Sequence, residues 1–334
     1  MDIVKYITEN SGFIFNSSCG APVNISVKNE RHTSTVFFCD VQFDTGLEKK
    51  IIIKKYDRSE KSRMISLQNE FRFSRDHYQD FNTEDIGIPR YLHFDVPNEL
   101  LVIEYVNQSS TLEKTLFDSR KIYRSLPLHP LFYNIGKWLS RFHLLSLNIS
   151  PVSCSKEELL KEIKPKWMQV FDDQQGIQSD LKFLIEKATS ENFPTCKATL
   201  HKEYGPGNIL HVNNKVYGID FGTPENGHVL DDIAYFIISV LVLNKYPDHA
   251  LYKRINSESL EIKSFLDGYM STSIIDKELV SSDLFNFYLY KNLIRRMSHQ
   301  FAKARQAPKP LKFIAKIVVN NVFYKTKHSF LPKY

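Results

Sequence analysis

The chain of 334 residues has few cysteines and no long apolar run, and both shortages exclude classes of protein. Its four cysteines are scattered, without a Cys-x-x-Cys pair or metal-ligand spacing, which argues against a disulfide framework and fits a reducing compartment. No apolar span reaches the length of about eighteen residues that a membrane helix needs, and the longest, Ile233–Leu243, is interrupted by Ser239. The N-terminus lacks the apolar run of a secretory signal. We therefore expect a soluble, cytoplasmic protein.

Acidic residues are absent between Lys291 and Lys333, although the net charge of the whole chain is only +6. Such a run is commonly a solvated face, but it also suits an anionic partner such as a phosphorylated glycan, lipid headgroups or nucleic acid. After a break at Ala307–Pro310, Lys312 and Lys316 lie opposite an apolar stripe of Leu311, Ile314 and Val318. This basic helix either packs on the protein, the favoured interpretation, or makes peripheral contact with a membrane. No recognition motif supports a nucleic-acid partner, and none is expected.

Most of the chemistry that is present lies in one stretch, Leu200–Phe236. Two short apolar runs, Ile209–Val212 and Val216–Ile219, flank a polar tip at Asn213–Lys215. This pattern predicts a β-hairpin whose turn tolerates positive φ. A polar loop precedes the first strand and an acidic residue follows the second, so the hairpin can bring side chains from both together.

Three residues of this stretch, Glu203, Asn208 and Asp220, form a set with a chemical meaning. Mg²⁺ prefers oxygen ligands, and in kinases one Asp and one Asn hold the metals while another carboxylate orients the attacking hydroxyl. Asn208 and Asp220 therefore suit the metal, and Glu203 suits the catalytic base. The alternative is a surface hairpin whose polar residues only form turns. The order and spacing of the set favour the catalytic interpretation.

The stretch resembles the catalytic hairpin of the aminoglycoside phosphotransferase and choline kinase group, which are small-molecule relatives of protein kinases. The residues that match are His201, Pro206-Gly207-Asn208-Ile209-Leu210, Ile219-Asp220-Phe221 and Asp232-Ile233-Ala234. In the family the Asp that corresponds to Asp232 braces the catalytic loop. Two positions depart from the pattern, because Lys202 replaces the usual Gly and Glu203 replaces the catalytic Asp.

The resemblance implies a lysine and glutamate pair in the first third of the chain. Lys54 follows an apolar strand, Ile51–Ile53, as the phosphate-pairing lysine of a kinase does. Lys54 and Lys55 point to opposite faces of a strand, so only one can enter a cleft, and the family match favours Lys54. Glu70, on a predicted helix over Ser62–Tyr78, is expected to hold this lysine on the nucleotide phosphates.

The nucleotide base and phosphates leave weaker signals. The strand Leu100–Ile103 resembles the strand before a kinase hinge, so the Glu104 carbonyl and the Val106 amide are expected to contact adenine. A glycine-rich loop is expected before the lysine, yet Val27–Ser34 contains no glycine. Glycine allows the backbone to approach phosphates closely, so this shortage weakens the kinase interpretation.

The resemblance implies an α+β, two-lobed protein-kinase-like fold. Residues 1–106 would form a small β-rich nucleotide-binding lobe, residues 107–306 a larger helical catalytic and substrate lobe, and residues 307–334 a basic helical tail. Helices are predicted over 131–145, 157–171, 178–189, 229–243, 258–269 and 276–305, with His143 as a packed core residue.

The implied function is ATP- and Mg-dependent transfer of the γ-phosphoryl group to a hydroxyl of a small molecule or glycan. Sugars, amino sugars and precursors of lipopolysaccharide or capsule are candidate acceptors, and the basic tail leans towards an anionic glycan. The alternative is a catalytically inactive kinase-like protein that binds nucleotide or a partner. Glu203 and the glycine-free segment support that alternative.

Overall fold

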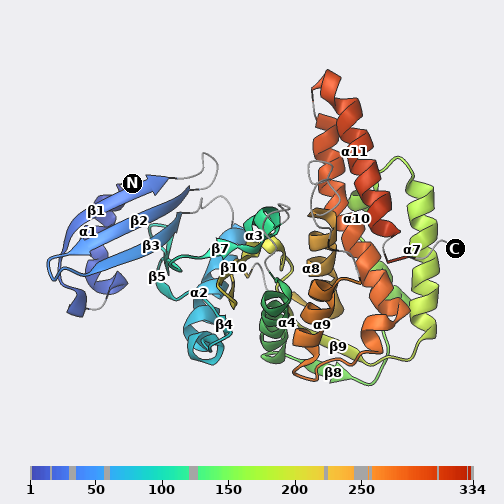
Figure 1. Cartoon of the computed structure of the whole chain (residues 1–334), viewed down its shortest axis with the longest axis horizontal. Coiled ribbons are helices and arrows are strands. Elements are labelled where there is room, and N and C mark those ends of the chain that lie inside the picture. Colours follow the sequence, from blue (N-terminus) through green and yellow to red (C-terminus); the bar gives the residue numbers. More distant parts are fainter. Residues whose placement is uncertain are drawn as a thin grey trace. The chain divides into compact units, whose positions relative to one another are not determined.

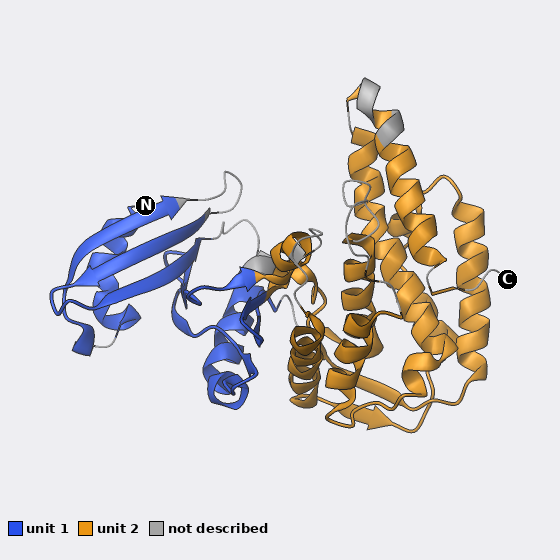
Figure 2. Ribbon diagram, viewed as in Figure 1, with its two compact units in different colours: residues 1–110, 210–224 blue, residues 111–209, 225–334 orange. Residues whose placement is uncertain are grey.

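The structure is a computed structural model that describes residues 2–15, 17–29, 35–55, 61–119, 127–221, 225–243, 255, 258–306, 308–328 and 330–331. Residues 30–34, which end the glycine-free segment, lie outside the described part. The chain divides into two compact units (Figure 2). The first comprises residues 1–110 and 210–224, and the second comprises residues 111–209 and 225–334.

A five-stranded antiparallel sheet forms the centre of the first unit (Figure 1). Its order is β1 (Pro22–Asn29), β2 (Thr35–Phe43), β3 (Glu48–Lys55), β6 (Leu100–Glu104) and β5 (Tyr91–Asp95). Strands β2 and β3 pair antiparallel as a hairpin, and β3 contains the strand Ile51–Ile53 that the sequence predicts. Gly46 takes a φ of 80° in the turn between them, a conformation that favours glycine.

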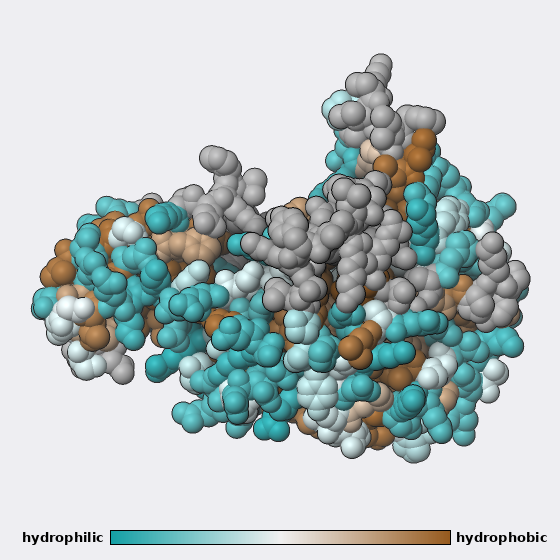
Figure 3. All heavy atoms as spheres, in the orientation of Figure 1, coloured by the Kyte–Doolittle hydropathy of each residue, from teal (hydrophilic) through white to brown (hydrophobic). Residues whose placement is uncertain are grey.

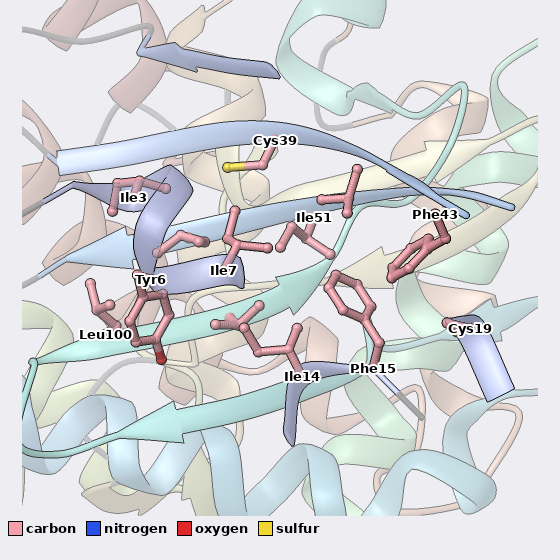
Figure 4. Close-up of a cluster of buried hydrophobic side chains, with 13 residues drawn as sticks. Ile3, Tyr6, Ile7, Ile14, Phe15, Cys19, Cys39, Phe43, Ile51 and Leu100 are labelled. Atoms are coloured by element: carbon pink, nitrogen blue, oxygen red, sulfur yellow. The ribbon is translucent and has the colours of Figure 1, made fainter. Parts of the chain in front are cut away.

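A helix that the sequence analysis did not predict, α1 (Ile3–Ile14), packs on this sheet. Asp2 caps it, because the carboxylate accepts a hydrogen bond from the Val4 backbone N–H at 2.9 Å. The buried face of α1 and the sheet form one apolar core (Figure 4). Its members include Ile3, Tyr6, Ile7, Ile14, Cys39, Val41, Ile51 and Leu100.

The rest of the first unit consists of α2 (Lys61–Phe81), η1 (Ser17–Cys19) and most of a second sheet. That sheet has the order β4 (Ile86–Gly87), β11 (Lys215–Gly218), β10 (Ile209–Val212) and β7 (Ser110–Thr111). The β10 and β11 strands form the hairpin predicted for the catalytic stretch. Its tip residue Asn213 has a φ of 54°, as a turn tolerant of positive φ requires.

The second unit is mainly helical (Figure 1). Its helices are α3 (Leu112–Ser119), α4 (His129–Leu144), α5 (Lys156–Lys161), α6 (Pro165–Met168), α7 (Gln174–Ser190), α8 (Leu230–Leu243), α9 (Leu260–Met270), α10 (Asp283–Gln306) and α11 (Lys309–Lys327), with 3₁₀ turns η2 (Pro206–Asn208) and η4 (Leu279–Ser281). A three-stranded antiparallel sheet has the order β12 (Glu225–His228), β9 (Thr195–Leu200) and β8 (Asn148–Ser150).

Two glycines let α4 and α9 approach with their backbones almost in contact. A Cβ atom on Gly136 would lie 2.0 Å from the Phe265 carbonyl oxygen, and one on Gly268 would lie 1.9 Å from the Tyr133 carbonyl oxygen. Both distances are far below a van der Waals contact, so neither position accepts a side chain without moving a helix. Helix α8 is buried along nearly its whole length, which its apolar sequence predicts.

Two helix predictions were wrong at their boundaries. The helix predicted over 157–171 is two short helices, α5 and α6, separated before Pro165. Proline has no backbone N–H and disfavours helical geometry in the residue before it, and Lys164 is extended, with φ −90° and ψ 117°. The helix predicted over 276–305 begins only at Asp283, after the turn η4.

The basic tail forms α11, which packs on α10 as the favoured interpretation expects. Val322 and Phe323 are buried, while Lys316 lies 2.6 Å from Asp172 and Lys327 lies 2.5 Å from Asp180. The side chains of Leu311 and Ile314, which the predicted stripe includes, lie outside the described part. Among described residues, no helix has the length and apolarity to cross a membrane. Hydrophilic residues cover most of the described surface on the face in Figure 3.

Candidate active site

In the first unit, Lys54, Glu70 and Asp220 form a cluster. The Lys54 ammonium contacts the Asp220 carboxylate directly and lies 3.9 Å from the nearer Glu70 carboxylate oxygen. The side chain of Lys54 is 17% exposed and that of Asp220 is 44% exposed, so the lysine is the more enclosed partner. Strand β3, helix α2 and the segment that follows β11 each contribute one member, although Lys54 and Asp220 are 166 positions apart in sequence.

Glu70 is buried, and a tyrosine helps to hold it. The Tyr91 hydroxyl donates a hydrogen bond of 3.1 Å to the Glu70 carboxylate. Burial raises the pKa of Glu70 to about 7, because the opposing influence of Lys54 is smaller than the cost of removing the carboxylate from water. The negative charge of Asp220 raises the pKa of Glu70 further. The buried Glu70 carboxyl therefore holds its proton to a higher pH than an ordinary glutamate does.

The backbone places Asp220 in an uncommon conformation. Its φ is 57°, in the left-handed region that Asp tolerates better than most residues. The next residue, Phe221, is buried, and its ring centroid lies 4.8 Å from that of Phe73 on α2 and 6.3 Å from that of Tyr91. These ring contacts fix the backbone immediately after Asp220, and this fixed backbone positions the Asp220 carboxylate.

In the second unit, Asp232 organises the loop that carries Glu203. One Asp232 oxygen accepts hydrogen bonds from the His201 backbone N–H at 2.6 Å and from His143 Nε2 at 3.1 Å. The other accepts from the Lys202 backbone N–H at 2.8 Å. His143 is completely buried, and its Nδ1 lies 2.7 Å from the Tyr269 hydroxyl. His143 is thus a core residue, as expected, and also a polar support of Asp232, which the sequence analysis did not anticipate.

Lys202 occupies the position where the family pattern has Gly, and its backbone conformation explains why glycine is favoured there. Its φ is 67°, the left-handed region that favours glycine. The ammonium lies 3.5 Å from the buried Asp231 and 3.4 Å from the exposed Glu225. Burial would raise the pKa of Asp231, but the charges of Lys291 and Lys202 outweigh it and lower the pKa. The side chain of Lys202 therefore compensates by ion pairing for a backbone conformation that glycine would adopt freely.

Glu203 and Asn208 are joined through the loop backbone. The Glu203 carbonyl accepts hydrogen bonds from the Gly205 backbone N–H at 2.7 Å and from Asn208 Nδ2 at 3.0 Å. Between them Tyr204 is fully buried and stacks on Trp138 with 5.2 Å between ring centroids. The Glu203 side chain itself is exposed. The loop is anchored on both sides of Glu203, while its carboxylate faces solvent.

Asn208 and Asp220 fit the ligand chemistry of Mg²⁺. Asn208 uses Nδ2 for the Glu203 carbonyl, so its Oδ1 remains available as an oxygen ligand, and the Asp220 carboxylate is a ligand of the same hard-oxygen type. The two residues belong to different units, and each is placed by contacts within its own unit. The residues that the structure describes contain no group of three or more His, Cys, Asp or Glu side chains arranged around a metal. An Asp and Asn pair completed by water and phosphate oxygens needs no such group.

The predicted hinge residues lie at the end of the main sheet. Glu104 is the last residue of β6 and pairs with Ile51 of β3. Beyond it, the Tyr105 backbone N–H donates to the Lys50 carbonyl at 3.0 Å, and the Val106 carbonyl accepts from the Ser109 backbone N–H at 3.2 Å. The chain therefore leaves the sheet in a fixed conformation at this point. Adenine contacts at Glu104 and Val106 remain a prediction.

A cavity of about 550 Å³ in the second unit adjoins Glu203. Its other walls come from α6, α8 and α10, and include Trp167, Tyr235, Arg295 and Arg296. No sequence motif marks these residues. They are far from Glu203 in sequence, and no local spacing marks two arginines on a long helix as part of a site.

No protein-family description matches the chain, and no curated protein sequence is similar to it. Several solved structures are similar in fold. Amicoumacin kinase hAmiN, in complex with AMP-PNP, Ca²⁺ and Ami, has a TM-score of 0.58 at 12% identity, covering 99% of this chain and 95% of that protein. Choline kinase LicA from Streptococcus pneumoniae has a TM-score of 0.52 at 12% identity, covering 97% and 99%. Macrolide 2'-phosphotransferase MphH from Brachybacterium faecium has a TM-score of 0.57 at 9% identity, covering 96% and 98%.

These likenesses extend over nearly the whole of each chain. The predicted α+β kinase-like fold, with a β-rich first part and a helical second part, is therefore confirmed.

Proposed function

We propose that this protein is an ATP- and Mg-dependent phosphotransferase that moves the γ-phosphoryl group to a hydroxyl of a small molecule. The observation that carries the proposal is the cluster of Lys54, Glu70 and Asp220 in the first unit. A lysine enclosed between two carboxylates, one buried and one exposed, is the arrangement that kinases use to hold phosphates and metal. The fold shared with choline, amicoumacin and macrolide kinases supports the same assignment.

Each residue has a role that its contacts suit. Lys54 would bind nucleotide phosphates, and Glu70 would position Lys54. Asp220 and Asn208 would hold Mg²⁺, and the backbone at Glu104 and Val106 would contact adenine. Bound Mg-ATP supplies the phosphoryl group and the charge neutralisation that its transfer needs.

Glu203 would orient the acceptor hydroxyl and take its proton. The anchored loop suits this role, because the hydrogen bonds of Asp232 and the burial of Tyr204 fix the backbone on both sides of Glu203. Phosphoryl transfer depends mostly on positioning, and a misplacement of about 1 Å can cost about a hundredfold in rate. Glu is longer than Asp by one methylene group, so the acceptor hydroxyl would have to bind correspondingly further from the loop backbone.

A catalytically inactive kinase-like protein is the second candidate function, and Glu203 is the observation that favours it. If Glu203 replaced the family Asp because catalysis was lost, the parent would bind Mg-ATP without transferring phosphate to any acceptor. Glu203→Asp would then restore a trace of activity. If the site is adapted to the longer side chain, Glu203→Asp should instead lower an existing activity through its shorter reach.

The test combines nucleotide binding with turnover. Asp220→Ala should abolish Mg-dependent ATP binding, measured by calorimetry, because it removes the only charged ligand of the proposed metal pair. Asp40→Ala is the matched control, since Asp40 is an exposed carboxylate of the same unit that pairs with Lys50. Equal ATP affinity in Asp220→Ala and the parent, with Mg²⁺ present, would show that the metal assignment is wrong.

Turnover is measured by mass-detected phosphate transfer to a panel of sugars and amino alcohols. Glu203→Gln should abolish transfer while leaving Mg-ATP binding unchanged. Glu186→Gln is the control, because Glu186 is exposed on α7 of the same unit. A parent that binds Mg-ATP but transfers nothing, together with an active Glu203→Asp, would establish the inactive-kinase alternative.

A further inference from the structure

The cavity beside Glu203 has a lining that selects for charge. Lys166 and Trp167 come from α6, Tyr235 comes from α8, and Arg295 and Arg296 come from α10. Since Glu203 lines the same cavity, a molecule bound there has the proposed catalytic carboxylate as part of its surroundings. A volume of about 550 Å³ is in the range of small-molecule sites.

We propose that this cavity is the acceptor site and that it takes a hydroxylated small molecule bearing a phosphate or carboxylate group, which Arg295 and Arg296 bind. The role as acceptor site rests on the proposed phosphotransferase function. The binding of an oxyanion does not, because it depends only on the residues that line the cavity.

The charge of the lining is strongly one-sided. Lys166, Arg295 and Arg296 are basic residues, and Glu203 is the one carboxylate among the residues that line the cavity. A polycationic acceptor would face three like charges here, whereas an anionic acceptor would be attracted and its hydroxyl could still be directed to Glu203.

The two arginines are ready to bind an oxyanion. The Arg295 guanidinium carbon lies 4.8 Å from the centre of the Tyr235 ring, a cation–π contact that holds the planar group in place. Arg296 Nε is shielded from solvent and has no hydrogen-bond partner among the described residues. A buried N–H without an acceptor is unfavourable, and a phosphate or carboxylate oxygen would satisfy it with a charge-assisted hydrogen bond. Guanidinium groups match these anions better than ammonium groups, because they offer two parallel donors.

Two aromatic residues complete the site. Trp167 and Tyr235 both line the cavity; the Tyr235 ring holds Arg295, and Trp167 offers apolar ring surface to the carbon skeleton of a ligand. Their presence favours a ring-shaped acceptor, such as a sugar phosphate or a sugar acid, over a free inorganic anion. The basic tail is not needed for this preference, because Lys316 and Lys327 of α11 are paired with acidic residues of the same unit.

The experiment is a binding series with four matched probes, measured by calorimetry on the full chain without nucleotide. The probes are glucose, glucosamine, glucuronate and glucose 6-phosphate, which differ mainly in charge. We expect glucuronate or glucose 6-phosphate to bind at least about tenfold more tightly than glucose, and glucosamine to bind most weakly. The ranking of glucuronate against glucose 6-phosphate distinguishes a carboxylate site from a phosphate site.

Variants then assign the effect to the arginines. Arg295→Gln and Arg296→Gln should each weaken binding of the anionic probe about ten- to hundredfold and leave glucose unchanged. Arg296→Lys keeps the charge but not the paired donors, so it should fall between the parent and Arg296→Gln. Arg305→Gln is the control, because Arg305 lies on the same helix but pairs with Asp172 outside the cavity, and it should behave as the parent does.

The outcomes separate the two proposals. If glucose or glucosamine binds as tightly as the anionic probes, or if none of the four probes binds, the inference is wrong. It is also wrong if Arg295→Gln and Arg296→Gln bind the anionic probe as the parent does. A parent that shows the expected ranking but neither binds Mg-ATP nor transfers phosphate would retain the oxyanion site and lose the proposed function. A parent that phosphorylates only neutral or amino sugars would retain the function and refute the anionic acceptor.

Discussion

Lys202 offers a test in which two physical effects of opposite sign act at one residue. Replacing Lys202 by Ala removes the ion pairs and keeps a Cβ atom in the left-handed conformation, where φ is 67°. Replacing it by Gly removes the same ion pairs but also removes the steric penalty of that conformation. The difference in free energy of unfolding between Lys202→Ala and Lys202→Gly therefore gives the backbone contribution. The loss in Lys202→Ala relative to the parent gives the ion-pair contribution, because Lys and Ala both carry a Cβ atom.

The structure sets the magnitudes. Glu225 is 68% exposed, so its pair with Lys202 contributes no more than about 0.5 kcal/mol. Asp231 is only 4% exposed, but Lys291 remains 2.8 Å away after the substitution, so the loss is about 1–2 kcal/mol rather than that of an isolated buried charge. The left-handed conformation costs about 1 kcal/mol more for Ala than for Gly. We expect Lys202→Ala to lower the free energy of unfolding by about 1.5–2.5 kcal/mol and Lys202→Gly by about 0.5–1.5 kcal/mol.

The assay uses the position of the tryptophans. The chain has two, Trp138 and Trp167, and both lie in the second unit with Lys202. Tryptophan fluorescence during urea unfolding therefore follows this unit. If Lys202→Gly is no more stable than Lys202→Ala, the left-handed backbone at this position is refuted. If both variants match the parent, the ion pairs contribute nothing and the substitution of Gly by Lys needs another explanation.

Three other predictions concern the polar contacts of Asp232, Glu70 and Lys327. Asp232→Asn turns one acceptor oxygen into a donor that faces a backbone N–H group, so the free energy of unfolding of the second unit should fall by about 2–4 kcal/mol. Tryptophan fluorescence during urea unfolding measures this loss, and an unchanged urea midpoint would contradict the observed hydrogen bonds. Glu70 has a folded pKa of about 7 against an ordinary value of 4.5, so the folded state holds its proton more tightly and stability falls as pH rises between these values. From about pH 5 to about pH 8 the parent should lose up to about 3 kcal/mol more than Glu70→Gln, measured by urea unfolding followed by circular dichroism, and equal losses would refute the pKa shift. Lys327→Ala should lower the free energy of unfolding by at most about 1 kcal/mol, because its partner Asp180 is partly exposed. The loss should be smaller at high salt, and no loss at low salt would mean that the pair does not stabilise α11.

Local chemistry explains which elements the sequence predicts well. The β10–β11 hairpin carries its own turn signal, and Asn213 takes the positive φ that this signal requires. Helix α8 follows from a continuous apolar run. The helix predicted over 157–171 failed because its apolar residues were weighed without the effect of Pro165 on the residue before it. Helix α1 was missed although Asp2 and the spacing of Ile3, Tyr6 and Ile7 form an ordinary start signal.

The candidate site shows a different limit. Lys54, Glu70 and Asp220 were identified through the order of family motifs, and the structure shows that their side chains meet. Tyr91, which donates a hydrogen bond to Glu70, could not be found in this way, because one tyrosine on a strand has no distinctive spacing. Arg295 and Arg296 were likewise seen only as part of a basic segment. Tertiary packing brings them to the same cavity as Glu203, while other cations of that segment pair with carboxylates.

The division of the chain has a consequence for its biosynthesis. The first unit includes residues 210–224, so it is interrupted in sequence by about a hundred residues of the second. During translation the strand β11, which pairs with β4, emerges long after the rest of that unit. The Lys54 and Asp220 contact therefore cannot form until the chain has been made past residue 220. A ribosome-bound chain that ends at residue 209 should have a folded five-stranded sheet whose lysine still lacks its aspartate, and pulse proteolysis of stalled chains would show the first unit becoming resistant in two steps.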